Sequence, residues 1–184
     1  MLRDLVLRAS TGDHDAFASL ATDAYGRLHR TAQLILRQED LASDAVQEAL
    51  TSAWLHIRAV RDPDRFDAWL HRLVVRACYQ ELRRARRRPT QIRVDAIVGP
   101  GIDDSTSALA DRDQLERGFA HLSAEHRVAL VIHYYLGVAD AEAAAILDVP
   151  IGTFKSRLNR AHLSLRAALE AGERVTGIGQ ESIA

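Results

Sequence analysis

The chain has 184 residues, 47% of them hydrophobic and 27% charged, which suits one folded domain or two small ones and excludes wholesale disorder. Aromatic residues make up only 5%, a composition that favours small helical domains over a β-sandwich or a β-barrel. The net charge of −1 is unevenly distributed, because residues 58–93 carry 11 arginines against 4 acids while residues 94–116 carry 1 arginine against 6 acids. A concentrated arginine block predicts a polyanionic partner.

The first half of the chain has helical periodicity throughout. Either Asp13 or Asp15 is expected to cap the first long helix, and a second helix is expected from about residue 43 to residue 59. The pair Asp62-Pro63 predicts the start of a third helix, since aspartate suits the cap and proline the first helical position. This pattern runs into a dense arginine series and stops at Pro89, so we expect an N-terminal domain over residues 1–88.

The second half divides into a linker, a helical domain and a tail. Residues 89–113 combine turn-forming residues with negative charge, which predicts an acidic, flexible linker. The helical pattern resumes at about residue 114 and continues to about residue 171, and residues 172–184 are expected to form a frayed tail. The predicted fold is therefore all-α, with two small helical domains joined by a flexible linker.

The second domain contains a helix-turn-helix pattern. A short helix is expected over 139–147, the run Asp148-Val149-Pro150 breaks it, and a longer helix starts near Ile151 or Gly152. Along that longer helix the apolar residues form one narrow stripe, and no acid occurs between Val149 and Leu169. A basic, hydrogen-bonding outer face favours binding in the DNA major groove over an ordinary solvated surface. The predicted DNA-binding residues are Thr153, Lys155, Ser156, Arg157, Asn159 and Arg160.

Two further patterns occur in the first domain. Asp44, Gln47 and Glu48 fall on one helical face and form an acid–amide ridge, which by itself is more often a solvated surface than a docking site. An arginine series interleaved with aromatic residues follows it, a combination that can stack on unpaired bases while holding the backbone phosphates. The spacing of Phe66 and Trp69 also fits core packing.

Taken together, these patterns resemble the extracytoplasmic-function σ factors, the small two-domain bacterial initiation subunits of RNA polymerase. The resemblance covers about residues 10 to 170. Four segments carry it, in the same order and spacing as in the family: 43–54, 66–73, 122–137 and 152–161.

The resemblance implies a role for each group of residues. The acid–amide ridge would dock on the β′ subunit, the linker would let the second domain reach its own promoter element, and the second helix of the helix-turn-helix would read the minus-35 element. The implied minus-10 contacts are Arg58, Arg61, Trp69, Arg72, Arg76 and Tyr79. The expected partners are core RNA polymerase (β′ and β) and promoter DNA, and sequestration by an anti-σ protein stays open.

Three alternatives remain at this stage. The first is a helix-turn-helix regulator that never docks on polymerase, and the second is a σ-like protein whose two lobes interact and keep it inactive. The third is an enzyme, which we do not expect because nucleophile-elbow, zinc-protease and P-loop motifs are all missing. Cys78 lies on an apolar stripe and is interpreted as a buried thiol. We expect no metal, no cofactor, no membrane span, no signal peptide and a cytoplasmic location.

Overall fold

A computed structural model of the chain describes residues 1–87 and 114–181. Every regular element in these two ranges is a helix or a helical turn, and no strand occurs in them, which confirms the all-α prediction. The predicted linker, residues 89–113, lies outside the described residues. Among the described helices, none combines the length and the apolar character needed to cross a membrane.

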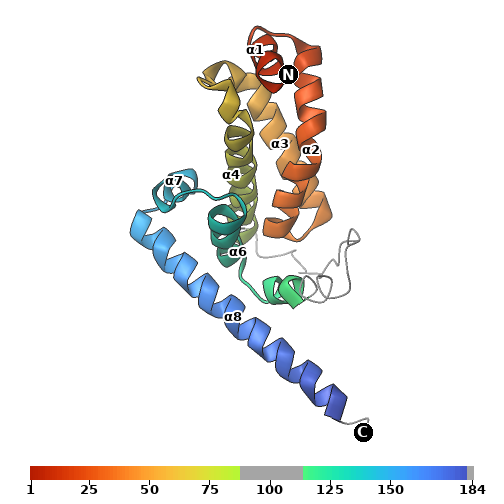
Figure 1. Cartoon of the computed structure of the whole chain (residues 1–184). Helices are drawn as coiled ribbons and strands as arrows, with labels where there is room; N and C mark the ends of the chain where they lie inside the picture. Colours follow the sequence, from red (N-terminus) through yellow and green to blue (C-terminus); the bar gives the residue numbers. More distant parts are fainter. Residues whose placement is uncertain (88–113, 182–184) are drawn as a thin grey trace.

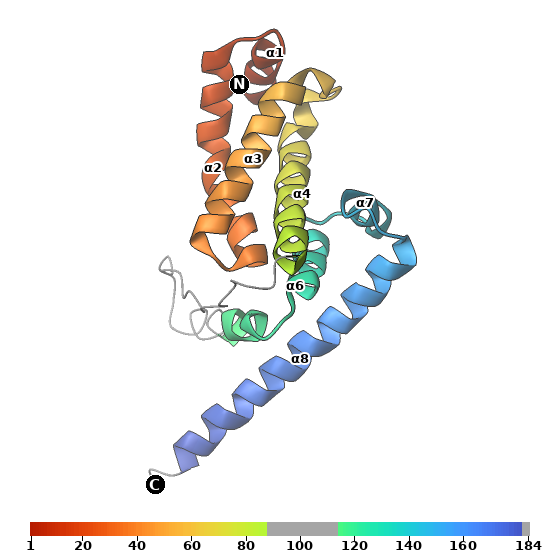
Figure 2. The same ribbon diagram turned by 180° about the vertical axis from the view of Figure 1, so that it is seen from behind.

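Three long helices form the N-terminal lobe, with a short helix at one end. Helices α2, α3 and α4 lie side by side, and α1 packs against the beginning of α2 (Figures 1 and 2). Two short turns, η1 and η2, join α3 to α4. The bounds are α1 Leu2–Ser10, α2 His14–Leu36, α3 Glu39–His56, η1 Ile57–Ala59, η2 Pro63–Arg65 and α4 Phe66–Arg87.

Local chemistry explains where these helices begin. The carboxylate of Asp13 accepts a hydrogen bond from the backbone N–H of Ala16 at 3.0 Å, which makes Asp13 rather than Asp15 the cap of α2 and lowers its pKa. Asp62 accepts from the N–H of Asp64 at 3.1 Å, which confirms the predicted Asp-Pro start. Helix α3 begins earlier than predicted, at Glu39, because two acids suit the positive end of the helix dipole.

The C-terminal lobe begins with a helix over 114–120 and contains the predicted helix-turn-helix as α7 and α8. The turn η3 is π-helical, and Ser123 caps α6 by accepting from the N–H of His126 at 3.3 Å. Helix α8 continues past the predicted end at residue 171, because glycine lowers helix propensity by only about 1 kcal/mol, whereas proline would end the helix. The bounds are α6 Ala124–Leu130, η3 Val131–Tyr135, α7 Asp140–Ile146 and α8 Ile151–Glu181.

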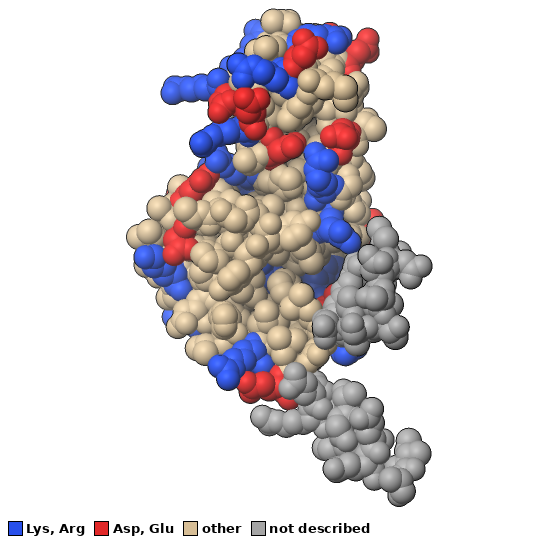
Figure 3. All heavy atoms as spheres, in the orientation of Figure 1, with Lys and Arg blue, Asp and Glu red and all other residues tan. Residues whose placement is uncertain are grey.

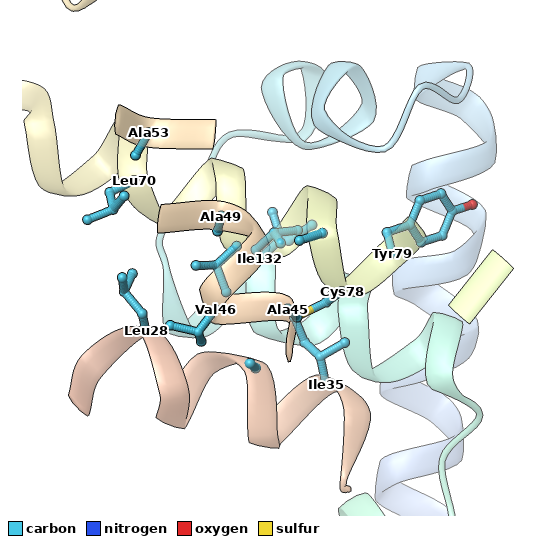
Figure 4. Close-up of a cluster of buried hydrophobic side chains, with 14 of the residues drawn as sticks. Leu28, Ile35, Ala45, Val46, Ala49, Ala53, Leu70, Cys78, Tyr79 and Ile132 are labelled. Atoms are coloured by element: carbon cyan, nitrogen blue, oxygen red, sulfur yellow. The ribbon is translucent and has the colours of Figure 1, made fainter. Parts of the chain in front are cut away.

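The two lobes share one hydrophobic core. Ile132 of η3 belongs to the same buried cluster as Leu28 of α2 and Val46 of α3 (Figure 4). Phe154 of α8 is fully buried in that cluster as well. Burial of apolar surface is the main stabilising contribution to folding, so a core that continues across both lobes ties their stabilities together.

We expect Phe154→Ala to lower the free energy of unfolding of the whole protein by about 3–5 kcal/mol, because it removes a fully buried aromatic ring. Urea denaturation followed by circular dichroism should show one cooperative transition shifted to lower urea, with a smaller shift for Phe154→Leu. An early partial transition, with the rest of the protein unfolding at the unchanged midpoint, would contradict a shared core.

Candidate nucleic-acid and polymerase interfaces

The acid–amide ridge lies on the outer side of α3. Asp44, Gln47 and Glu48 are exposed, while Ala45 and Ala49 on the opposite side of the helix are buried in the core. The amphipathic pattern of α3 thus turns the ridge outward, as the sequence predicted.

The ridge borders a shallow, open hollow that extends along α3 toward Leu55 and His56. Leu55 is 69% exposed, so the hollow has an apolar side chain at its end as well as the polar residues of the ridge. At the other side of the ridge, the Glu48 carboxylate lies 3.4 Å from the guanidinium of Arg84 on α4. From the sequence we predicted no role for Leu55, although the helical pattern places it among polar residues on the exposed side of the helix.

The turns between α3 and α4 carry two of the predicted minus-10 residues. Arg58 in η1 and Arg61, which lies between η1 and η2, are both exposed. Figure 3 shows arginine and acid side chains intermixed at this end of the molecule. Trp69, in the first turns of α4, is half-buried, and its ring centroid lies 5.8 Å from that of the buried Phe66. Core packing therefore holds one side of the indole while part of its surface stays accessible.

Along α4 the predicted minus-10 residues divide into open and covered positions. Arg76 is exposed, but Arg72 is half-buried and forms an ion pair with Glu142 of α7. Tyr79 is only 8% exposed, and its phenol oxygen accepts a hydrogen bond of 3.2 Å from Arg157 of α8. The C-terminal lobe thus covers two of the six residues in this arrangement of the chain.

On α8 some of the predicted minus-35 residues are exposed and others are partly buried. Lys155, Asn159 and Arg160 are exposed, and Phe154 and Ala161 on the opposite side are buried. Thr153 and Ser156 are partly buried, and the Ser156 hydroxyl donates to the Thr153 carbonyl at 3.0 Å. The outward face of α8 is therefore cationic and hydrogen-bonding, as the sequence predicted.

Arg157 differs from the other members of that set because it points toward the N-terminal lobe. Its side chain is 20% exposed, and its guanidinium contacts both Tyr79 and the carboxylate of Glu125, the latter at 3.5 Å. The same Glu125 carboxylate accepts a 2.8 Å hydrogen bond from Arg86 of α4. Arg157, Glu125 and Arg86 therefore form one charged chain between α8, α6 and α4.

A buried arginine completes the contact between the lobes. Arg127 of α6 is 6% exposed, and its guanidinium donates to the Ile35 carbonyl at 2.8 Å and the Leu122 carbonyl at 2.7 Å. Burial, together with the nearby charge of Arg37, lowers the pKa of Arg127 to about 10. From the sequence we predicted no role for Arg127, although a single cation beside the apolar run Val128–Ile132 could have indicated a buried arginine.

Two further predictions concern the cysteine and metal binding. Cys78 is buried, as predicted, and burial raises the pKa of its thiol to about 12. The part of the chain that the structure describes contains no group of three or more His, Cys, Asp or Glu side chains arranged to hold a metal ion.

Comparisons with protein families match both lobes. The model of Sigma-70 region 2 matches residues 20–88, and that of Sigma-70 region 4 matches residues 112–165. The extracytoplasmic-function (ECF) RNA polymerase sigma factor SigM of Mycobacterium tuberculosis is 36% identical over 90% of this chain and 83% of its own length. The ECF RNA polymerase sigma-E factor of Escherichia coli is 31% identical over 85% of this chain and 88% of its own length.

Two solved structures also superpose on this chain. The sigma factor RpoE of Bartonella quintana, in complex with the anti-sigma factor NepR, superposes with a TM-score of 0.65 at 26% identity, over 84% of this chain and 96% of that one. CnrH, in complex with the cytosolic domain of CnrY, superposes with a TM-score of 0.59 at 25% identity, over 92% of this chain and 97% of that one.

We expect Cys78 to react with a thiol reagent at pH 8 roughly a thousandfold more slowly in the folded protein than in urea, because a pKa of about 12 leaves almost no thiolate. Absorbance of the released chromophore gives both rates. Comparable rates in the two states would show that the thiol is accessible and ionised in the folded protein.

Proposed function

Since this chain belongs to the extracytoplasmic-function group of σ70-family factors, the subunits that direct core RNA polymerase to promoters, we propose that its two lobes divide promoter recognition between them. Residues 1–88 bind polymerase and the minus-10 element, residues 114–171 bind the minus-35 element, and residues 89–113 connect the two domains. The rival function, a helix-turn-helix regulator that does not dock on polymerase, is not favoured, because the relatives match both lobes and are σ factors.

The outward face of α8 supports this proposal most directly. Lys155, Asn159 and Arg160 are presented together on a helix whose other side is held by the buried Phe154. Lysine and arginine donate to guanine and phosphate, and asparagine pairs with adenine in the major groove. We assign Thr153, Ser156 and Arg157 to the same interface, with Arg157 joining it only after its contact with Tyr79 is released.

The minus-10 element is bound by the turns η1 and η2 and by α4. Arg58, Arg61 and Arg76 hold the backbone of the melted strand, and the accessible side of Trp69 stacks on a base. Arg72 and Tyr79 complete this surface once the C-terminal lobe moves away from α4. A base turned out of the stack costs a few kcal/mol, which stacking and arginine–phosphate contacts offset.

Polymerase docks on the acid–amide ridge. Asp44, Gln47 and Glu48 provide acceptors for basic side chains of the β′ subunit, and the exposed Leu55 adds an apolar contact at the end of the same hollow. The C-terminal lobe adds a contact to the β subunit. The protein works without catalysing a reaction and without a cofactor or metal. We place it in the cytoplasm, where polymerase and the chromosome lie, and expect an anti-σ partner such as those bound by the two solved relatives.

We expect Glu48→Lys to weaken binding to core polymerase by roughly tenfold, because it reverses a charge on the ridge. Affinity measured with labelled protein and purified core polymerase provides the test. The matched control is Glu170→Lys on α8, which also removes an exposed glutamate from an ion pair with an arginine. Equal affinities for the two variants would contradict the ridge as the docking surface.

We expect Lys155→Ala and Arg160→Ala each to lower transcription in vitro roughly tenfold at promoters that need the minus-35 element, since one base contact contributes about 1–3 kcal/mol. Run-off transcription with core polymerase measures the effect. Arg166→Ala, which removes an arginine paired with Glu170 further along α8, is the control and should transcribe as well as the unchanged protein. Full activity of both test variants would show that this face of α8 does not read the promoter.

A further inference from the structure

Two carboxylates of the C-terminal lobe form ion pairs with arginines at the contact between the two lobes. Glu125 of α6 contacts Arg86 of α4 and Arg157 of α8, and Glu142 of α7 contacts Arg72 of α4. We propose that these masking carboxylates, Glu125 and Glu142, occupy the place of DNA phosphates on the three arginines and so suppress promoter binding by the free protein. This inference rests on the proposed function, because Arg72 and Arg157 belong to its two DNA-binding surfaces.

The chemistry of the two ligands makes them competitors. Carboxylate and phosphate both bind a guanidinium through paired N–H donors, so an arginine held by one is not available to the other in the same geometry. Much of the affinity of a protein for DNA comes from the counterions that its cations release from phosphate. Arginines already neutralised inside the protein release fewer counterions, and the affinity for free DNA falls accordingly.

The Glu125–Arg157 pair is more buried than an ordinary surface ion pair. Glu125 and Arg157 are only 25% and 20% exposed, whereas Arg166 and Glu170, which pair within α8, are 73% and 46% exposed. Arg72 and Glu142 are intermediate, and Arg86 stays exposed. Water and salt screen a half-buried pair less than an exposed one, so the Glu125–Arg157 pair persists under conditions in which an exposed pair contributes little. Glu125 also contacts two arginines at once, so one carboxylate interacts with a cation of each lobe.

The packing between the lobes keeps the masking carboxylates in position. Arg127, two residues from Glu125 on α6, bonds to the Ile35 carbonyl at the end of α2. Ile132 lies in the core shared with the N-terminal lobe, and Tyr79 of α4 bonds to Arg157 directly. As long as both carboxylates are present, the mask is released when the lobes separate, and a partner that binds the separated lobes, core polymerase in the proposed function, frees the arginines together.

The test compares two doubly neutralised proteins. Glu125→Gln with Glu142→Gln removes the mask and changes no residue assigned to DNA. Glu170→Gln with Asp148→Asn is the matched control, because it removes the same charge from the same lobe at positions that pair within α8 or lie exposed in the turn before it. Fluorescence anisotropy with a labelled promoter duplex, in the absence of polymerase and over a series of salt concentrations, measures both affinity and its salt dependence.

We expect the unmasked protein to bind at least tenfold more tightly than the control, with a slope of log K against log salt steeper by about 2, as the release of Arg72 and Arg157 predicts. Glu142→Gln alone, which leaves α6 unchanged, should steepen the slope by about 1. Circular dichroism and urea denaturation verify that each variant is folded. Equal affinity and equal slope for the unmasked and control proteins would overturn the inference.

Transcription with core polymerase separates this inference from the proposed function. If the unchanged protein supports initiation while the unmasked and control proteins bind free DNA equally, the mask is wrong and the function stands. If the unchanged protein supports no initiation at any promoter tested, the proposed function fails, whatever the anisotropy shows.

Discussion

The packing of the C-terminal lobe against α2 and α4 is the interaction on which the rest of the structure depends. Apolar side chains of both lobes form one core, and Arg127 lies at its edge, where its guanidinium donates to the Ile35 carbonyl near the end of α2. Removing that cation from water lowers its pKa to about 10, yet it stays protonated at neutral pH, and its two carbonyl bonds offset part of the desolvation. The cation also satisfies a helix-end carbonyl that has no partner within α2.

This packing decides which functional surfaces are open. The acid–amide ridge on α3 and the outward face of α8 point away from the contact between the lobes, so both surfaces are accessible in the packed state, as the proposed docking of polymerase and duplex DNA requires. The inward face of α4 is covered, and with it Arg72 and Tyr79. In the proposed function, polymerase therefore binds first, and the surface for the melted strand is completed after the lobes separate.

The sequence alone predicted the features that depend on residues close together along the chain. The cap at Asp13, the Asp62-Pro63 start and the helix-turn-helix follow from local hydrogen bonding and helical period, and the outward face of α8 follows from its apolar stripe. The contacts between the lobes could not be derived in this way, because Arg157 with Tyr79 and Arg127 with Ile35 join residues 78 and 92 positions apart. The sequence predicted Tyr79 only as a minus-10 contact and gave no sign that Arg157 of the second lobe would cover it.

A distance measurement between the lobes tests most directly whether they are packed together in the free protein and separate when polymerase and promoter DNA bind. Ser19→Cys on α2 and Ser164→Cys on α8 place two labels on exposed positions, while the buried Cys78 remains unlabelled. We expect one narrow distance distribution for the free protein and a clearly displaced one when core polymerase and promoter DNA are added. A broad distribution in the free protein, or an identical distribution in the complex, would contradict the packing of the two lobes as the controlling interaction.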